Sequence, residues 1–193
     1  MTRWSTHLPV NRALRRWLAV GGSLSARLAK AGPGLQVRRL RQGGGRARSD
    51  EATRLGGTQA VLRREVVLSA GGAARVVARS LTPRPAALGP WRAVGGLGQR
   101  PLADVLFGPR APQRSALQFA RLTPHSPAHQ AVRRALAQAE HTALPAAPTR
   151  LGALWARRSV FWRRGAPLMV TEVFLPSVAQ LPAPGAQHWT PAR

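Results

Sequence analysis

Cysteine is absent from the 193 residues of the chain. Disulfide bonds and metal sites built on thiolates are therefore excluded. Tyrosine and isoleucine are absent as well, asparagine occurs only at Asn11, and lysine only at Lys30. Since thirty residues are Lys or Arg, nearly all of the positive charge is arginine. A GC-rich genome replaces Lys, Ile, Tyr and Asn in this way, so codon usage explains part of the arginine content.

Acidic residues are scarce too: six Asp and Glu leave a formal net charge of +24. A field of this sign attracts anionic partners, which range from small carboxylates to nucleic acid. The arginines are scattered along the whole chain, and the aromatic side chains that stack on bases are few. Both features disfavour nucleic-acid binding, which we keep as one alternative function.

Long hydrophobic runs are also missing, and none approaches the roughly 18–20 residues of a membrane helix. The apolar piece at 17–20, which follows the N-terminal arginines, is too short for a signal peptide. We therefore expect a cytoplasmic protein without membrane insertion. The length fits one domain over residues 1–176, and the proline-containing segment 177–193 is expected to be a disordered tail.

Hydrophobic spacing and turn residues predict an α+β fold, in which a single antiparallel β-sheet carries helices packed on it. The expected helices span residues 11–20, 24–31 (with Ser23 as N-cap) and 127–140, with two short pieces within 86–107. The expected strands span residues 35–41, 60–69, 73–82, 115–122, 152–163 and 167–175. The polar, glycine-rich segment 42–58 is expected to be a flexible loop.

One of the six acids, Glu172, lies inside a strongly apolar stretch, 167–176. The strand period of two places Glu172 on one face with Leu168, Val170 and Phe174. An ionised carboxylate in an apolar wall is costly unless it is paired, hydrogen-bonded or shifted in pKa. Glu172 is therefore a candidate for chemistry or ligand recognition.

The same period places Arg64 on an otherwise apolar face with Leu62, Val66 and Leu68. If both faces line one cavity, it suits a small ring with a carboxylate on one side and a hydroxyl on the other. The planar guanidinium of Arg64 can donate two parallel hydrogen bonds to a ligand carboxylate. Two bland alternatives remain open. One is a buried Arg64–Glu172 ion pair, which would stabilise the fold weakly, and the other is pairing of Arg64 and Glu65 elsewhere.

Six segments match, in order, the pattern of one known family. They are 22–25 (GSLS), 62–68 (LRREVVL), 78–83 (ARSLTP), 97–107 (LGQRPLADVLF), 154–159 (LWARRS) and 165–176 (GAPLMVTEVFLP). Together they resemble the chorismate pyruvate-lyase (chorismate lyase) family, the first enzyme of bacterial ubiquinone synthesis. The closing segment is the most specific of the six. The resemblance implies an α+β fold with an enclosed ligand cavity.

The resemblance also implies conversion of chorismate to 4-hydroxybenzoate and pyruvate, with no metal and no cofactor. The ligand-contacting arginine of the family falls on Arg64, its glutamate on Glu172 and its leucine on Leu102. Its methionine falls on Leu24, which keeps an apolar contact. We expect Arg64 to bind the ring carboxylate and Glu172 to contact the ring hydroxyl, as general base or as orienting acceptor. Arg79 is our first candidate for the enolpyruvyl carboxylate.

Two functions of other classes remain as alternatives. One is a non-catalytic, small-molecule-sensing domain of related sheet architecture, which the lack of a preceding helix-turn-helix pattern disfavours. The other is an Arg-rich nucleic-acid-binding protein, whose binding would fall steeply with salt. For the enzyme, the expected partners are chorismate and 4-hydroxybenzoate, and the expected oligomeric state is a monomer.

Overall fold

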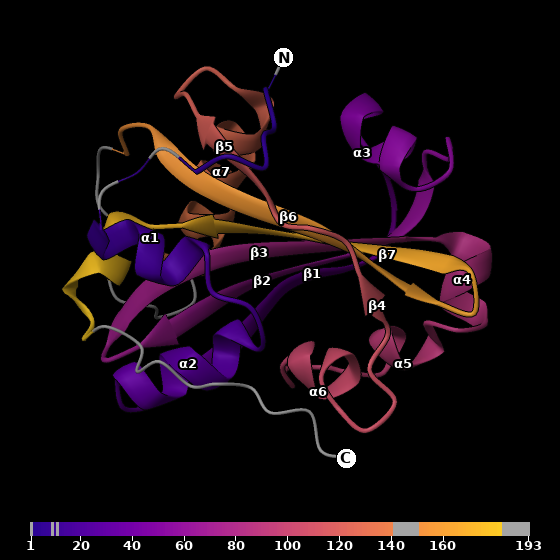
Figure 1. Ribbon diagram of the computed structural model, residues 1–193, viewed down its shortest axis with the longest axis horizontal. Coiled ribbons are helices and arrows are strands. Elements are labelled where there is room, and N and C mark those ends of the chain that lie inside the picture. The colour runs from indigo at the N-terminus through magenta and orange to yellow at the C-terminus, as the bar shows by residue number, and fades with distance from the viewer. Residues whose placement is uncertain (1, 9, 11, 141–150, 183–193) are drawn as a thin grey trace.

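The structure is a computed structural model, which describes residues 2–8, 10, 12–140 and 151–182 (Figure 1). In this part of the chain, seven strands form one antiparallel sheet in the order β1-β2-β3-β7-β6-β4, and β5 also pairs with β6. The strands are β1 (Gln36–Arg46), β2 (Ala60–Ala70), β3 (Ala73–Pro83), β4 (Gln113–Arg114), β5 (Gln118–Leu122), β6 (Leu154–Arg163) and β7 (Ala166–Phe174). The prediction of an α+β fold on a single antiparallel sheet is confirmed.

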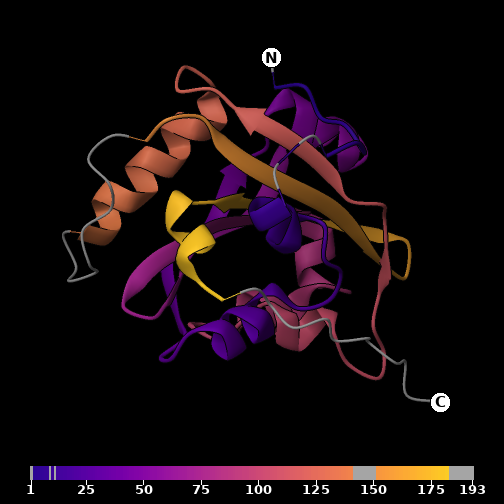
Figure 2. The ribbon, with the colours of Figure 1, turned by 60° about the vertical axis from the view of Figure 1, so that its left-hand side comes forward.

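Helices cover both faces of this sheet (Figures 1 and 2). They are α1 (Arg12–Leu18), α2 (Leu24–Ala31), α3 (Ser49–Arg54), α4 (Arg84–Leu88), α5 (Arg92–Gly95), α6 (Ala103–Leu106), α7 (Pro127–Glu140) and the 3-10 helix η1 (Pro176–Gln180). Within the described residues, no helix has both the length and the apolar character needed to cross a membrane.

The two faces of the sheet bury different helices. On one face, apolar residues of α1, α2, α4, α5 and α6 pack on side chains such as Val66, Val170 and Phe174. On the other face, α7 packs on Val67 and Val173, and α3 packs next to Met169. Successive strand residues point to opposite faces, so the central strands are apolar on both sides. A polar side chain on either face therefore interrupts an apolar surface.

Several local elements form as the sequence predicts. Ser23 caps α2, since its hydroxyl accepts a hydrogen bond from the backbone N–H of Ala26 at 3.1 Å. The β6–β7 hairpin turns at Arg164 and Gly165, which have φ of 50° and 74°. This positive-φ pair matches the right-handed twist of the strands that it joins. The hairpin turn sets the register of β7 against β6 and so places Glu172.

The prediction of a flexible loop over 42–58 is wrong. Strand β1 continues to Arg46, with Gly43 and Gly45 paired to Arg63 and Val61 of β2. Helix α3 follows, and the Glu51 carboxylate accepts a hydrogen bond from the backbone N–H of Arg48 at 2.8 Å. Glycines are rare in strands, but pairing along the whole of β2 holds them in the sheet here.

The prediction of a disordered tail over 177–193 is wrong for its first residues. Residues 176–180 form η1, in which Val178 is fully buried. The guanidinium of Arg75 donates to the backbone carbonyl of Ser177, and the Ser177 hydroxyl donates to the carbonyl of Ala74 at 2.5 Å. These contacts anchor the start of the segment on the sheet. The rest of the predicted tail, 183–193, lies outside the described residues.

Candidate active site

The strand register brings Arg64 and Glu172 onto the same face of the sheet. Arg64 of β2 lies opposite Ser80 of β3, and Ser80 lies opposite Val170 of β7. One row further along, Ala78 lies opposite Glu172, which in turn lies opposite Arg157 of β6. Because directly paired residues of adjacent strands point to the same side, the two candidate residues occupy neighbouring rows of one surface.

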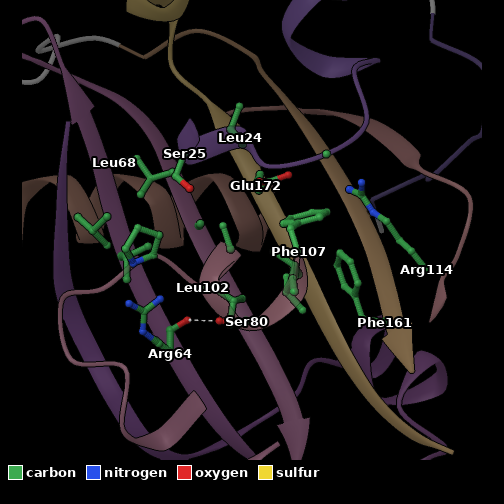
Figure 3. A pocket seen from close by; sticks show the side chains of 18 residues that line it. Leu24, Ser25, Arg64, Leu68, Ser80, Leu102, Phe107, Arg114, Phe161 and Glu172 are labelled. Carbon is green, nitrogen blue, oxygen red and sulfur yellow. Dashed lines mark hydrogen bonds between the residues drawn. The ribbon is translucent and has the colours of Figure 1, made fainter. Parts of the chain in front are cut away.

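A pocket opens over this surface (Figure 3). Its empty space is about 600 Å³, with the open solvent at its mouth included. The sheet forms its floor, while Leu24 of α2 and Leu102 and Phe107, which flank α6, form its walls. Leu24 and Leu102 therefore both line this pocket, and their contact with a ligand stays a prediction. Full enclosure of the ligand stays a prediction.

Arg64 is only 2% exposed, yet it forms no salt bridge with an acid in the described part of the chain. Its Nη2 donates to the backbone carbonyls of Gly98 and Arg100, at 3.2 and 2.8 Å. Its Nε is buried and has no hydrogen-bond partner in the described part of the chain. Burial, with a smaller contribution from Arg39, lowers the pKa of Arg64. A desolvated guanidinium with a free donor is prepared to bind an anion.

The predicted alternative of an Arg64–Glu172 ion pair does not occur, and Glu172 instead pairs with Arg157. The Nε of Arg157 donates to Glu172 Oε2 at 2.5 Å. Among the described residues, Glu172 Oε1 has no hydrogen-bond partner, and the carboxylate lines the pocket. One oxygen of Glu172 is thus fixed by the protein and the other remains for a ligand. The sequence signals identified Glu172 but not its partner.

Arg114 is a pocket residue that the sequence did not indicate. It lies across the pocket from Arg64, with Glu172 between them (Figure 3). Its Nε donates to the Ser159 hydroxyl at 3.0 Å, and its guanidinium lies 5.0 Å from the ring centroid of Phe161. Burial above all, with the charge of Arg157, lowers the pKa of Arg114 to about 10, and Glu172 opposes this shift. Strand β4 has only two residues, so it offers no period from which a face could be read.

The placement of Arg79 in the site is wrong. In β3, Ala78 and Ser80 line the pocket, so Arg79 points to the other face of the sheet. There Arg79 Nη2 lies 3.1 Å from a carboxylate oxygen of Glu51, and Nη1 lies 2.6 Å from one of Glu65. Both carboxylates compensate its charge, so its role in this fold is structural.

A comparison with protein families matches the family described as chorismate lyase over residues 3–181. The chain belongs to the chorismate lyase family. A relative from Albidiferax ferrireducens, named "Probable chorismate pyruvate-lyase", is 45% identical over 176 residues, which cover 90% of this chain and 87% of the relative. A relative of the same name from Cupriavidus pinatubonensis is 40% identical over 189 residues, covering 94% and 92%. The family that the six sequence segments predicted is confirmed.

Solved structures share the fold of this chorismate lyase family member at much lower identity. The effector domain of PhnF from Mycobacterium smegmatis superposes with a TM-score of 0.50 and 14% identity, over 82% of this chain and 91% of that domain. A PhnF C-terminal domain gives a TM-score of 0.51 and 13% identity, over 77% and 87%. At these identities the likeness shows a common fold and nothing about the ligand.

Proposed function

We propose that this chain is a lyase that converts chorismate to 4-hydroxybenzoate and pyruvate, the first committed step of ubiquinone synthesis. Membership in the chorismate lyase family and relatives named for this reaction support the proposal. The structural observation that carries it is the pocket. Within the residues that the structure describes, Arg64 is a buried guanidinium without an acidic partner, and it shares an apolar pocket with Glu172, a carboxylate that keeps one oxygen free of hydrogen bonds.

The pocket suggests how the ring binds. The carboxylate and the hydroxyl of 4-hydroxybenzoate lie at opposite ends of the ring, and chorismate has the same arrangement. We place the ring carboxylate on Arg64, where Nη2 donates to the carbonyls of Gly98 and Arg100 and Nη1 keeps its hydrogens for the ligand among the described residues. The ring hydroxyl then donates to Glu172 Oε1. Leu24 and Leu102 cover the ring with apolar surface.

Chorismate carries a second carboxylate, on the enolpyruvyl ether, and we assign it to Arg114 in place of Arg79. Arg114 lies in the pocket, stays protonated at neutral pH with a pKa of about 10, and is held by Ser159 and Phe161. In the described part of the chain, no carboxylate lies within ion-pair distance of its guanidinium. It is therefore free to hold the leaving group while the ether bond breaks.

The chemistry requires orientation more than strong acid or base catalysis. The bond between the ring and the ether oxygen breaks, the carbon that bears the hydroxyl loses its hydrogen as a proton, and the ring becomes aromatic. The released enolpyruvate becomes pyruvate. Aromatisation drives the reaction, so the residues mainly orient the ring and stabilise negative charge on the leaving oxygen. Glu172 accepts the hydroxyl hydrogen bond, and its variants decide whether it also takes the proton.

The direct test mixes the purified full chain with chorismate and measures 4-hydroxybenzoate and pyruvate together. Equal amounts of both products are expected. Glu172→Gln separates the two roles of this carboxylate. A general base would lower kcat by about 10²–10⁴-fold and leave product affinity nearly unchanged, whereas an orienting acceptor would lose product affinity first. Near-normal turnover and affinity in both Glu172→Gln and Arg64→Ala would refute the site assignment.

A ligand-sensing function remains the second candidate, because the structural neighbours include effector domains. The same assay distinguishes it, since a sensor would bind 4-hydroxybenzoate or chorismate and release neither product. A monomer, as expected from the sequence, remains our proposal for the oligomeric state. Light scattering of the purified chain tests this expectation.

A further inference from the structure

Arg157 contacts two separate parts of the site. One is Glu172 in the floor of the pocket, and the other is the chain segment that follows α1. It is one of the most buried charged residues described, with 1% of its surface exposed. Its Nε donates to Glu172 Oε2 at 2.5 Å. Its Nη1 donates to the backbone carbonyls of Trp17, Leu18 and Val20, at 3.3, 3.1 and 2.7 Å. Arg157 is therefore a candidate for an indirect role, exerted through Glu172 and without contact with a ligand.

Trp17 and Leu18 are the last two residues of α1, where backbone oxygens lose their partners within the helix, and Val20 lies just after it. A buried cation at this helix end satisfies those oxygens and interacts favourably with the helix dipole. The chain then runs directly from Val20 into Gly22 and Leu24, which line the pocket. Arg157 thus joins the segment that carries one wall of the pocket to Glu172 in its floor.

The guanidinium of Arg157 also has a fixed orientation. It lies 5.5 Å from the ring centroid of Phe174, and its planar fork has donors directed at both the carboxylate and the helix end. A carboxylate with one oxygen held by a rigid donor keeps its second oxygen in one direction. Water has little access to this pair, so the hydrogen bond is stronger than a surface contact.

We propose that Arg157 is a positioning residue for the lyase reaction. It directs Glu172 Oε1 toward the ring hydroxyl and couples that orientation to the α1–α2 connection at the pocket wall. The inference rests on the proposed function, because it assumes that Glu172 meets the hydroxyl. Because Arg157 acts through the Glu172 carboxylate, replacing Arg157 should not change ligand recognition further once that carboxylate has been removed.

The neighbouring Arg158 provides a matched control. It lies on the same strand, is also buried, and pairs with Asp50 at 2.9 Å and with the ring of Trp4 at 4.1 Å. It points to the opposite face of the sheet and does not line the pocket. Replacing either arginine by lysine removes a guanidinium fork and keeps the charge. General damage to the sheet would therefore affect both variants alike.

The experiment compares the affinities of the full chain for 4-hydroxybenzoate and for benzoate, which lacks the hydroxyl, by calorimetry. We expect the wild-type chain to prefer 4-hydroxybenzoate. Arg157→Lys should lose roughly tenfold or more of this preference while its affinity for benzoate stays near the wild-type value. Arg158→Lys should keep the preference. In a Glu172→Gln background, Arg157→Lys should change the preference by less than about twofold.

An unchanged preference in Arg157→Lys, or an equal loss for both ligands, would overturn the proposal. The proposal would also be overturned if the effects of Arg157→Lys and Glu172→Gln on the preference for 4-hydroxybenzoate were additive in the double variant. If Arg157→Lys does not fold, Arg157→Met is measured in its place with the same criteria, and failure of both to fold while Arg158→Lys folds counts as a structural role and also overturns it. The proposed function fails separately, if the wild-type chain releases neither 4-hydroxybenzoate nor pyruvate from chorismate.

Discussion

Replacing Arg64 by methionine separates a binding cation from a structural one. Methionine has a similar length and no charge, so the variant fills the space under the pocket and removes the guanidinium. That guanidinium is buried and has no acidic partner among the described residues. The substitution also removes its two hydrogen bonds to backbone carbonyls. Its lowered pKa reflects the same burial, which disfavours its charged form in the folded chain.

We expect Arg64→Met to change the free energy of unfolding less than it changes the free energy of ligand binding. An uncompensated buried charge carries an effective desolvation penalty of several kcal/mol, and two hydrogen bonds from a charged donor contribute about 3 kcal/mol or somewhat more. These terms nearly cancel, so the free energy of unfolding should change by less than about 2 kcal/mol. Removing one partner of a desolvated charge pair costs about 2–5 kcal/mol in binding. That loss weakens 4-hydroxybenzoate by about 30-fold to several thousand-fold.

Urea denaturation and calorimetry with 4-hydroxybenzoate test both values in the same preparation. At a ligand concentration of 100 times the wild-type Kd, the wild-type chain should gain about 2.7 kcal/mol of stability, and Arg64→Met should gain less than about 1 kcal/mol at that concentration. Arg63→Met is the matched control, since Arg63 faces away from the pocket and lies near Glu65. A loss of 3 kcal/mol or more, about that of a broken buried ion pair, with unchanged affinity would refute the reasoning.

Three further predictions concern other parts of the site and the fold. Arg114→Gln should raise the KM for chorismate by about 10-fold or more and leave 4-hydroxybenzoate affinity unchanged, because the product lacks the second carboxylate; steady-state kinetics and calorimetry together check this. Leu102→Ala should weaken product binding by about 1–2 kcal/mol, whereas Leu88→Ala, at a side chain that is 85% exposed, should not. Glu51→Gln should destabilise the chain by about 3 kcal/mol in urea denaturation, since it removes a carboxylate that is 1% exposed and pairs with Arg79, but kcat should be retained.

The shared face of Arg64 and Glu172 was predictable because each lies within a long, regular strand. In such strands the period of two is reliable, and a single charge among apolar neighbours marks the face that it interrupts. The period does not say how two strands are aligned. Sequence reasoning therefore left open an ion pair between these residues, which the observed register excludes by placing Arg157 opposite Glu172.

The wrong choice between arginines has a related cause. Arg79 belongs to a segment that matches the family, but its neighbours Ala78 and Ser80 face the pocket, so its own side chain cannot. Arg114 lies in a two-residue strand whose position depends on pairing with β6, forty-seven residues later in the chain. Long-range pairing of this kind leaves no local pattern. The same holds for 42–58, where pairing with β2 overrides the low strand propensity of three glycines.

Charge balance gives an independent reason for the proposed substrate class. Among the described residues, the pocket lining and the salt bridge to Glu172 contain three guanidinium groups, of Arg64, Arg114 and Arg157, and one carboxylate, of Glu172. Since Arg157 and Glu172 compensate each other, two positive charges remain, one on each side of the pocket. Chorismate is a dianion with two separate carboxylates, so it neutralises both, whereas a monoanion leaves one buried cation unpaired.

After the ether bond breaks, each product keeps one carboxylate and one arginine. Pyruvate can then leave from Arg114 while 4-hydroxybenzoate stays bound to Arg64, so we expect pyruvate to be a weak product inhibitor and 4-hydroxybenzoate a strong one.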